Sequence, residues 1–180
     1  PHLDALAARG VRFDDAVTSA PITGPAHAAI FTGMYPARYG VRDNATTPLP
    51  DRATTLAERL SQAGFATGGF IGAFVLDRAY GFAQGFAAFS GFESVASGSE
   101  ANAERRGEAV VDDALQWING VPRQQPMFLW VHLYDPHAPY DAPAPFGAQF
   151  ASSPYDGEVA YVDQQIGRVL DALRARGTLD

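Results

Sequence analysis

The sequence predicts an α/β domain in which a mostly parallel sheet is covered by helices on both faces. Residues 65–75 and 127–133 are almost continuously apolar and lie between glycine or proline breakers, which is typical of strands buried on both faces. Amphipathic helical patterns at residues 104–118 and 155–176 alternate with these strands. The 180 residues suit one domain, since no internal repeat or linker divides them.

The first part of the chain carries clear helix and strand signals. Residues 2–9 present a short apolar face and end at a glycine, so we predict a helix there. Residues 11–17 alternate apolar and polar side chains, which predicts a short strand. Residues 26–31 are compatible with a helix, and Pro25 suits its first position.

The middle of the chain predicts a helix at residues 53–63, with leucines on one face and a glycine stop. Residues 80–100 are rich in Gly, Phe and Ser, and we predict a loop that folds its aromatic rings onto the domain. The strand at 127–133 is expected to be central, because its apolar run shows no polar alternation.

Composition narrows the function classes. The net charge is −7, and all 13 basic residues are arginines spread along the chain, which argues against nucleic acid as a partner. Cysteine is absent, which removes disulfides, thiolate metal sites and cysteine nucleophiles. No apolar run is long enough to span a bilayer, and no signal peptide is visible. Because the first residue is proline and the last follows a helical pattern, we expect the domain to be truncated at both ends.

The turn before the helix at 26–31 presents a hydroxyl group. Thr23 lies in a Pro- and Gly-containing turn near the positive end of that helix, where backbone N–H groups favour an anion. His27 lies one turn further and can lean back toward the same point. A hydroxyl, an anion-binding helix end and an imidazole indicate transfer of a phosphoryl or sulfuryl group. The alternative is that Thr23 only caps the helix.

A second polar cluster follows the strand at 127–133. Ligands of open α/β sheets bind beyond the carboxyl ends of the strands, which makes Asp135 and His137 candidate substrate-binding and catalytic residues. Prolines on either side of His137 fix its loop. Spacing alone leaves open that His137 is a surface residue and that Asp135 only forms a turn. His132, inside the apolar strand, is expected to be a satisfied core histidine.

A further loop follows the Thr23 helix and could return toward the same site. Arg42 could clamp an oxyanion with paired donors, and Asn44 could bind substrate beside it. Solvated loop side chains are the alternative for both. For Arg38 we expect the solvated role.

Taken together, these residues resemble the N-terminal part of the sulfatase family, which belongs to the alkaline phosphatase superfamily. The resemblance spans essentially the whole chain in the right order, and it implies that residues 1–180 are a single, partial sulfatase-like catalytic domain. The segments that carry it are residues 1–13, 23–36, 56–67, 128–140 and 155–163.

The chain departs from the family pattern at the nucleophile. Sulfatases carry Cys or Ser in a C/S-x-P-x-R motif that is converted to formylglycine, whereas Thr23 and His27 occupy the first and last positions here. Threonine cannot form that aldehyde. The family's Gly-Lys-x-His motif aligns with Gly-Ala-Phe-Val at residues 72–75, so its Lys and His are missing. His137 matches the family's substrate-binding histidine.

The resemblance implies a sulfatase-like hydrolase that acts on a sulfate or phosphate ester. Thr23 would be the nucleophile and a ligand of an activating divalent metal, calcium or zinc. The other metal ligands would lie outside residues 1–180, so we expect this portion alone to bind no metal and to be inactive. One alternative is a phosphodiesterase or phosphoethanolamine-type transferase of the same superfamily. A second is a non-catalytic binding module, which the missing Lys and His favour.

The resemblance also bears on partners and location. The expected substrate is a small-molecule, glycan or lipid ester rather than nucleic acid. The family implies a periplasmic, secreted or membrane-anchored protein.

Overall fold

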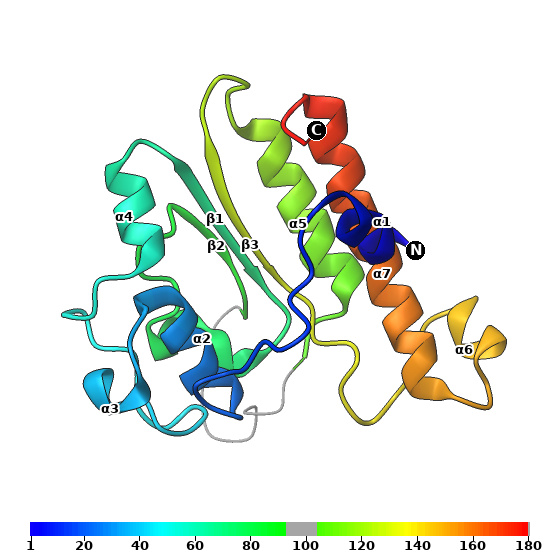
Figure 1. Ribbon diagram of the computed structural model, residues 1–180, viewed down its shortest axis with the longest axis horizontal. Helices are drawn as coiled ribbons and strands as arrows, with labels where there is room; N and C mark the ends of the chain where they lie inside the picture. Colours follow the sequence, from blue (N-terminus) through cyan, green and yellow to red (C-terminus); the bar gives the residue numbers. More distant parts are fainter. Residues whose placement is uncertain (93–103, 180) are drawn as a thin grey trace.

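A three-stranded parallel sheet forms the centre of the protein, shown as a computed structural model that describes residues 1–92 and 104–179 (Figure 1). Its strand order is β2–β1–β3, so β1 (Ala66–Ile71) lies between β2 (Ala88–Ser90) and β3 (Met127–His132). All three strands run in the same direction, so their carboxyl ends meet at one edge. The predicted parallel α/β architecture is confirmed.

Helices cover both faces of this sheet (Figure 1). On one face lie α5 (Gly107–Gly120) and α7 (Pro154–Arg176), and α1 (His2–Arg9) contacts α7. On the other face lie α2 (Thr23–Thr32) and α4 (Leu56–Gln62). Open α/β sheets bind ligands beyond the carboxyl ends of their strands, and this layering leaves that edge to the loops.

Four short helices complete the regular structure of the described residues. They are α3 (Pro36–Tyr39), η1 (Phe74–Leu76), η2 (Arg78–Tyr80) and α6 (Phe146–Gln149). Within the described ranges, no helix combines the length and the apolar run that a membrane span requires.

The core is aromatic on the α2 side of the sheet. The predicted folding of the phenylalanine rings onto the domain is confirmed, because Phe82 is buried and Phe86, Phe89 and Phe92 pack against the same cluster. The region is not wholly a loop, however, since it contains β2. Three residues are too short a strand to stand out by periodicity. The end of this predicted loop, from residue 93 on, lies outside the described residues.

The expectation that β3 is the central strand is wrong for the described sheet. β1 is central and almost wholly buried, whereas all six residues of β3 are half-buried. An apolar run reports that both faces of a strand are covered by side chains, but it carries no information about pairing at the strand's edges.

The strand predicted at residues 11–17 is also wrong. These residues form a loop with a turn at Asp14 and Asp15. Val11, Phe13 and Val17 expose 79%, 78% and 94% of their surface. Alternation alone does not make a strand, because no described strand lies beside this segment to pair with its backbone groups.

Helix starts differ from the predicted positions for local reasons. α2 begins at Thr23, with Ile22 as N-cap, so Pro25 is its third residue rather than its first. Proline is tolerated at this position, because the first four N–H groups of a helix have no intrahelical partner that the missing N–H of proline would remove. α4 begins at Leu56 because Thr55 and Glu58 form a reciprocal capping box.

Candidate functional site

The candidate site begins at the first turn of α2. His27 Nδ1 lies 2.8 Å from the carbonyl oxygen of Thr23. A carbonyl only accepts hydrogen bonds, so Nδ1 carries the proton and Nε2 of the neutral ring is an acceptor. The Thr23 side chain is half-buried and makes no hydrogen bond in the part of the chain that the structure describes. Its hydroxyl is therefore uncommitted at the start of the helix.

A row of four rings connects α2 with the loop after β3. We call His27, His132, Tyr134 and His137 the ring row. Successive ring centroids are 5.1 Å, 5.9 Å and 4.3 Å apart, and the last pair is stacked. The ring row brings two predicted catalytic histidines to the carboxyl edge of the sheet, but their contact runs through His132 and Tyr134. Convergence of Thr23, His27 and His137 on a single cleft stays a prediction.

His27 and His132, the two more deeply buried histidines of the ring row, are neutral at pH 7. Burial lowers the pKa of His27, although its bond to Thr23 opposes the shift. Burial, with a smaller contribution from the neighbouring His27, lowers the pKa of His132 to about 3. The Nδ1 atom of His132 is buried and has no partner among the described residues. The expectation of a satisfied core histidine is therefore wrong, and His132 joins the site as a residue that periodicity could not single out.

The depressed pKa of His132 predicts acid-sensitive stability. The unfolded chain takes up a proton near pH 6.5 and the folded chain only near 3, so stability is lost as the pH falls through this window. Between pH 7 and pH 5 we expect a loss of about 2 kcal/mol from this group. Urea unfolding of the wild type and of His132→Phe at both pH values measures it. A variant with an unchanged pH dependence would contradict the assignment.

The loop that carries His137 is held at several points. His137 exposes 51% of its side chain, and its Nδ1 lies 3.3 Å from Glu104 Oε1. The buried Asp135 accepts the N–H of Gly107, the first residue of α5, at 3.0 Å. Glu158 of α7 accepts the N–H of Asp141 at 2.8 Å. The loop is thus tied to both helices of one face, and His137 keeps an accessible ring.

The predicted substrate-binding residues lie in different environments. Asn44 Oδ1 accepts the N–H of Gly24 at 2.7 Å, so this side chain holds the turn beside Thr23 and occupies one of the free N–H groups of α2. Asp135 points into the fold toward α5, as described above. Arg42 is exposed and makes no polar contact within the described ranges. The substrate-binding roles of these three residues stay predictions.

The segment that aligns with the family's Gly-Lys-x-His motif is part of the core. Ala73 and Val75 expose 2% and 8% of their surface. Neither side chain can move a proton, so this segment supplies no acid or base.

The described residues do not form a metal centre by themselves. No group of three or more His, Cys, Asp or Glu side chains within residues 1–92 and 104–179 could hold a metal ion. Thr23 alone does not make a site. Metal ligands for it would have to come from outside these residues.

The fold is a parallel α/β sheet with a free hydroxyl and imidazole rings at its carboxyl edge, the edge at which such sheets bind ligands. The family model named Sulfatase matches residues 1–180, and the chain belongs to the sulfatase family, in the alkaline phosphatase superfamily.

Individual proteins are similar to this chain in sequence or in fold. The chain is 28% identical to an arylsulfatase of Klebsiella aerogenes, over 94% of this chain and 44% of that protein. The structure of Ps i-CgsB in complex with k-i-k-neocarrahexaose matches with a TM-score of 0.79 at 22% identity, over 99% of this chain and 50% of that one. The phosphonate monoester hydrolase of Agrobacterium radiobacter matches with a TM-score of 0.75 at 18% identity, over 99% and 55%. The chain therefore spans about half the length of these proteins.

Proposed function

We propose that the full-length protein hydrolyses a sulfate or phosphate ester with Thr23 as the nucleophile. The observation that carries this proposal is the first turn of α2, where the Thr23 hydroxyl makes no hydrogen bond among the described residues and the Thr23 carbonyl oxygen accepts the Nδ1 proton of the neutral His27 ring. The ring row extends this arrangement to His137 at the carboxyl end of the sheet. Membership of the sulfatase family supports the same chemistry.

In the proposed reaction, Thr23 Oγ1 attacks the sulfur or phosphorus in line with the leaving oxygen. A bond forms from Oγ1 to the central atom, and the bond to the leaving alcohol breaks. We assign His27 as the proton acceptor for the hydroxyl: its Nδ1 proton is held by the Thr23 carbonyl oxygen, which leaves Nε2 as the accepting atom of the ring. His137 contacts the ester anion or protonates the leaving oxygen, and Glu104 orients its ring. Water then hydrolyses the threonine ester and restores the hydroxyl.

The proposal includes a divalent cation, calcium or zinc, in the full-length protein. A threonine hydroxyl is a weak nucleophile at neutral pH, so activation beyond a single imidazole is expected. The substrate is proposed to be a small-molecule, glycan or lipid ester, and a structural relative that holds a neocarrahexaose supports the glycan. A periplasmic, secreted or membrane-anchored location is part of the same proposal.

Two alternatives have specific support. The likeness of the fold to a phosphonate monoester hydrolase supports phosphoryl chemistry, as in a phosphodiesterase or a phosphoethanolamine-type transferase. The buried Ala73 and Val75 support a non-catalytic binding module, because the segment that aligns with the family's Lys and His contributes no catalytic side chain.

Metal analysis and an activity panel on the full-length protein test the proposal. The panel contains aryl sulfates, phosphate monoesters and phosphate diesters. We expect a bound divalent metal and turnover of one ester class, with no turnover by the 180-residue chain alone. Metal-free protein that is inactive on every ester would instead support the binding module. Turnover by the 180-residue chain without metal would contradict our account of how Thr23 is activated.

A further inference from the structure

A polar cavity lies at the carboxyl end of β2. Its volume is about 740 Å³, within the range of ligand sites. We call it the β2-end cavity. Its polar wall consists of Arg78, Ser90, Arg105 and Asp113, and its aromatic wall of Phe89 and Phe92.

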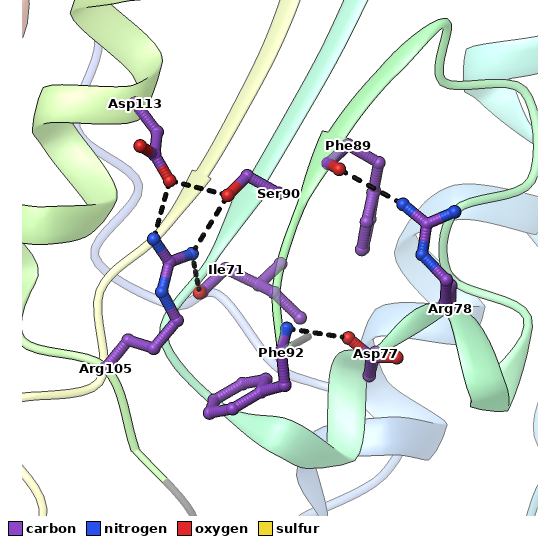
Figure 2. Close-up of polar contacts among 8 residues, drawn as sticks. All are labelled: Ile71, Asp77, Arg78, Phe89, Ser90, Phe92, Arg105 and Asp113. Carbon is purple, nitrogen blue, oxygen red and sulfur yellow. Dashed lines mark hydrogen bonds and ion pairs between the residues drawn. The ribbon is translucent and has the colours of Figure 1, made fainter. Parts of the chain in front are cut away.

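One side of the β2-end cavity is a fixed network. Arg105 NH2 donates to Asp113 Oδ2 at 2.6 Å, and Ser90 Oγ donates to the same oxygen (Figure 2). Arg105 NH1 donates to the carbonyl oxygen of Ile71, the last residue of β1, at 3.2 Å. These contacts neutralise Arg105 and hold the wall against the end of the sheet.

Arg78 lies on the other side and is less committed. Its NH2 group donates to the carbonyl oxygen of Phe89 at 3.2 Å, and its guanidinium carbon lies 5.6 Å from the centre of the Phe89 ring (Figure 2). It has no carboxylate partner among the described residues, and its side chain is exposed. The bond to Phe89 uses one N–H of the guanidinium and leaves the others for a ligand.

The wall of the cavity offers two arginines to a ligand and one carboxylate, Asp113, which Arg105 already binds. A second carboxylate, Asp77, is buried behind the wall, where it accepts the N–H groups of Ala79 and Phe92. An arginine fork matches the oxygen geometry of a carboxylate or a sulfate.

The β2-end cavity adjoins the candidate site through one short segment. Glu104 contacts His137, and the next residue, Arg105, lines the cavity. The backbone N–H of Arg105 is bonded to the carbonyl oxygen of Gly72 at 2.8 Å, just after β1. β2 and β3 are two strand spacings apart, about 10 Å.

We infer that the β2-end cavity is an anion subsite, in which Arg78 binds a second carboxylate or sulfate group carried by the ester substrate. The proposed function is needed only for the statement that the bound anion is part of the ester substrate. The binding of an anion at Arg78 stands on the cavity itself.

Anion binding to the full-length protein tests this inference. Inorganic sulfate, glucose 6-sulfate and glucuronate are titrated by calorimetry, with glucose as the uncharged control. We expect Arg78→Ala to weaken sulfate-group or carboxylate binding about tenfold. Arg52→Ala is the matched control, since Arg52 is an exposed arginine away from the cavity, and it should bind as the wild type does. The sulfate and carboxylate arms show which group the subsite takes.

A crystal soaked in selenate locates the anion, because selenium marks a sulfate position. A selenium peak beside Arg78 that disappears in Arg78→Ala is the expected result. Unchanged binding by Arg78→Ala, or no binding of any of the anions by the wild type, would overturn the inference. Thr23→Ala should leave the selenium peak in place, so failure of the catalytic proposal and failure of the subsite give different results.

Discussion

Thr23→Ala in the full-length protein is expected to reduce turnover by at least about a thousandfold, because the substitution removes the atom that attacks the ester. The free energy of unfolding should change by less than about 1 kcal/mol, since the Thr23 hydroxyl makes no hydrogen bond within the described residues. Steady-state kinetics and urea unfolding of the same preparation separate the two effects.

Thr23→Ser is the matched control for this loss. Serine keeps the hydroxyl at the start of α2, so measurable turnover should remain. Undiminished turnover in Thr23→Ala would remove Thr23 from the mechanism. Equal and complete loss in both variants would show that the site requires the methyl group or the backbone shape rather than the hydroxyl.

Gly85→Ala is expected to have the largest effect on stability, about 4 kcal/mol or more. A Cβ at this position would lie 2.2 Å from the backbone nitrogen of Glu58, and Gly85 has a φ of +87°. The Gly85 carbonyl also accepts the hydroxyl of Thr67 in β1 at 2.9 Å. The substitution would therefore push α4 away from the sheet. Chemical denaturation measures the loss.

Gly64→Ala separates backbone strain from this steric clash. Gly64 has nearly the same φ, +88°, but a Cβ there would meet nothing within 4 Å. We expect a cost of about 1 kcal/mol from the left-handed backbone alone. Similar losses for the two variants would mean that the close approach of Gly85 to α4 does not occur in solution.

The sequence was sufficient for the main architecture, because long periodic patterns report burial directly. The helix at residues 155–176 and the strand at 127–133 lie within one residue of their predicted bounds, as α7 and β3. Pairing order is a non-local property, which is why β1 rather than β3 is central among the described strands. The strand predicted from the alternation at residues 11–17 was wrong for the same reason, since a strand needs a partner that its own sequence does not specify.

Local motifs make Thr23 and His137 candidate residues, and their roles stay predictions. The contact between His27 and His132 was not predictable from the sequence, because His132 sits in an apolar strand and only the packing of α2 on the sheet brings His27 to it. Glu104 and Glu158, which hold His137 and its loop, lie far away in the chain and carry no motif. Contacts of this kind depend on the fold.

The direct test of the central claim is to trap the covalent threonine ester. The full-length protein is quenched in acid during turnover and digested with trypsin, and the peptide of residues 13–38 is fragmented by mass spectrometry. We predict a peptide that is heavier by one sulfuryl or phosphoryl group, localised to Thr23, and absent from Thr23→Ala. Modification at another residue, or an unmodified peptide under conditions where the ester accumulates, would contradict the account.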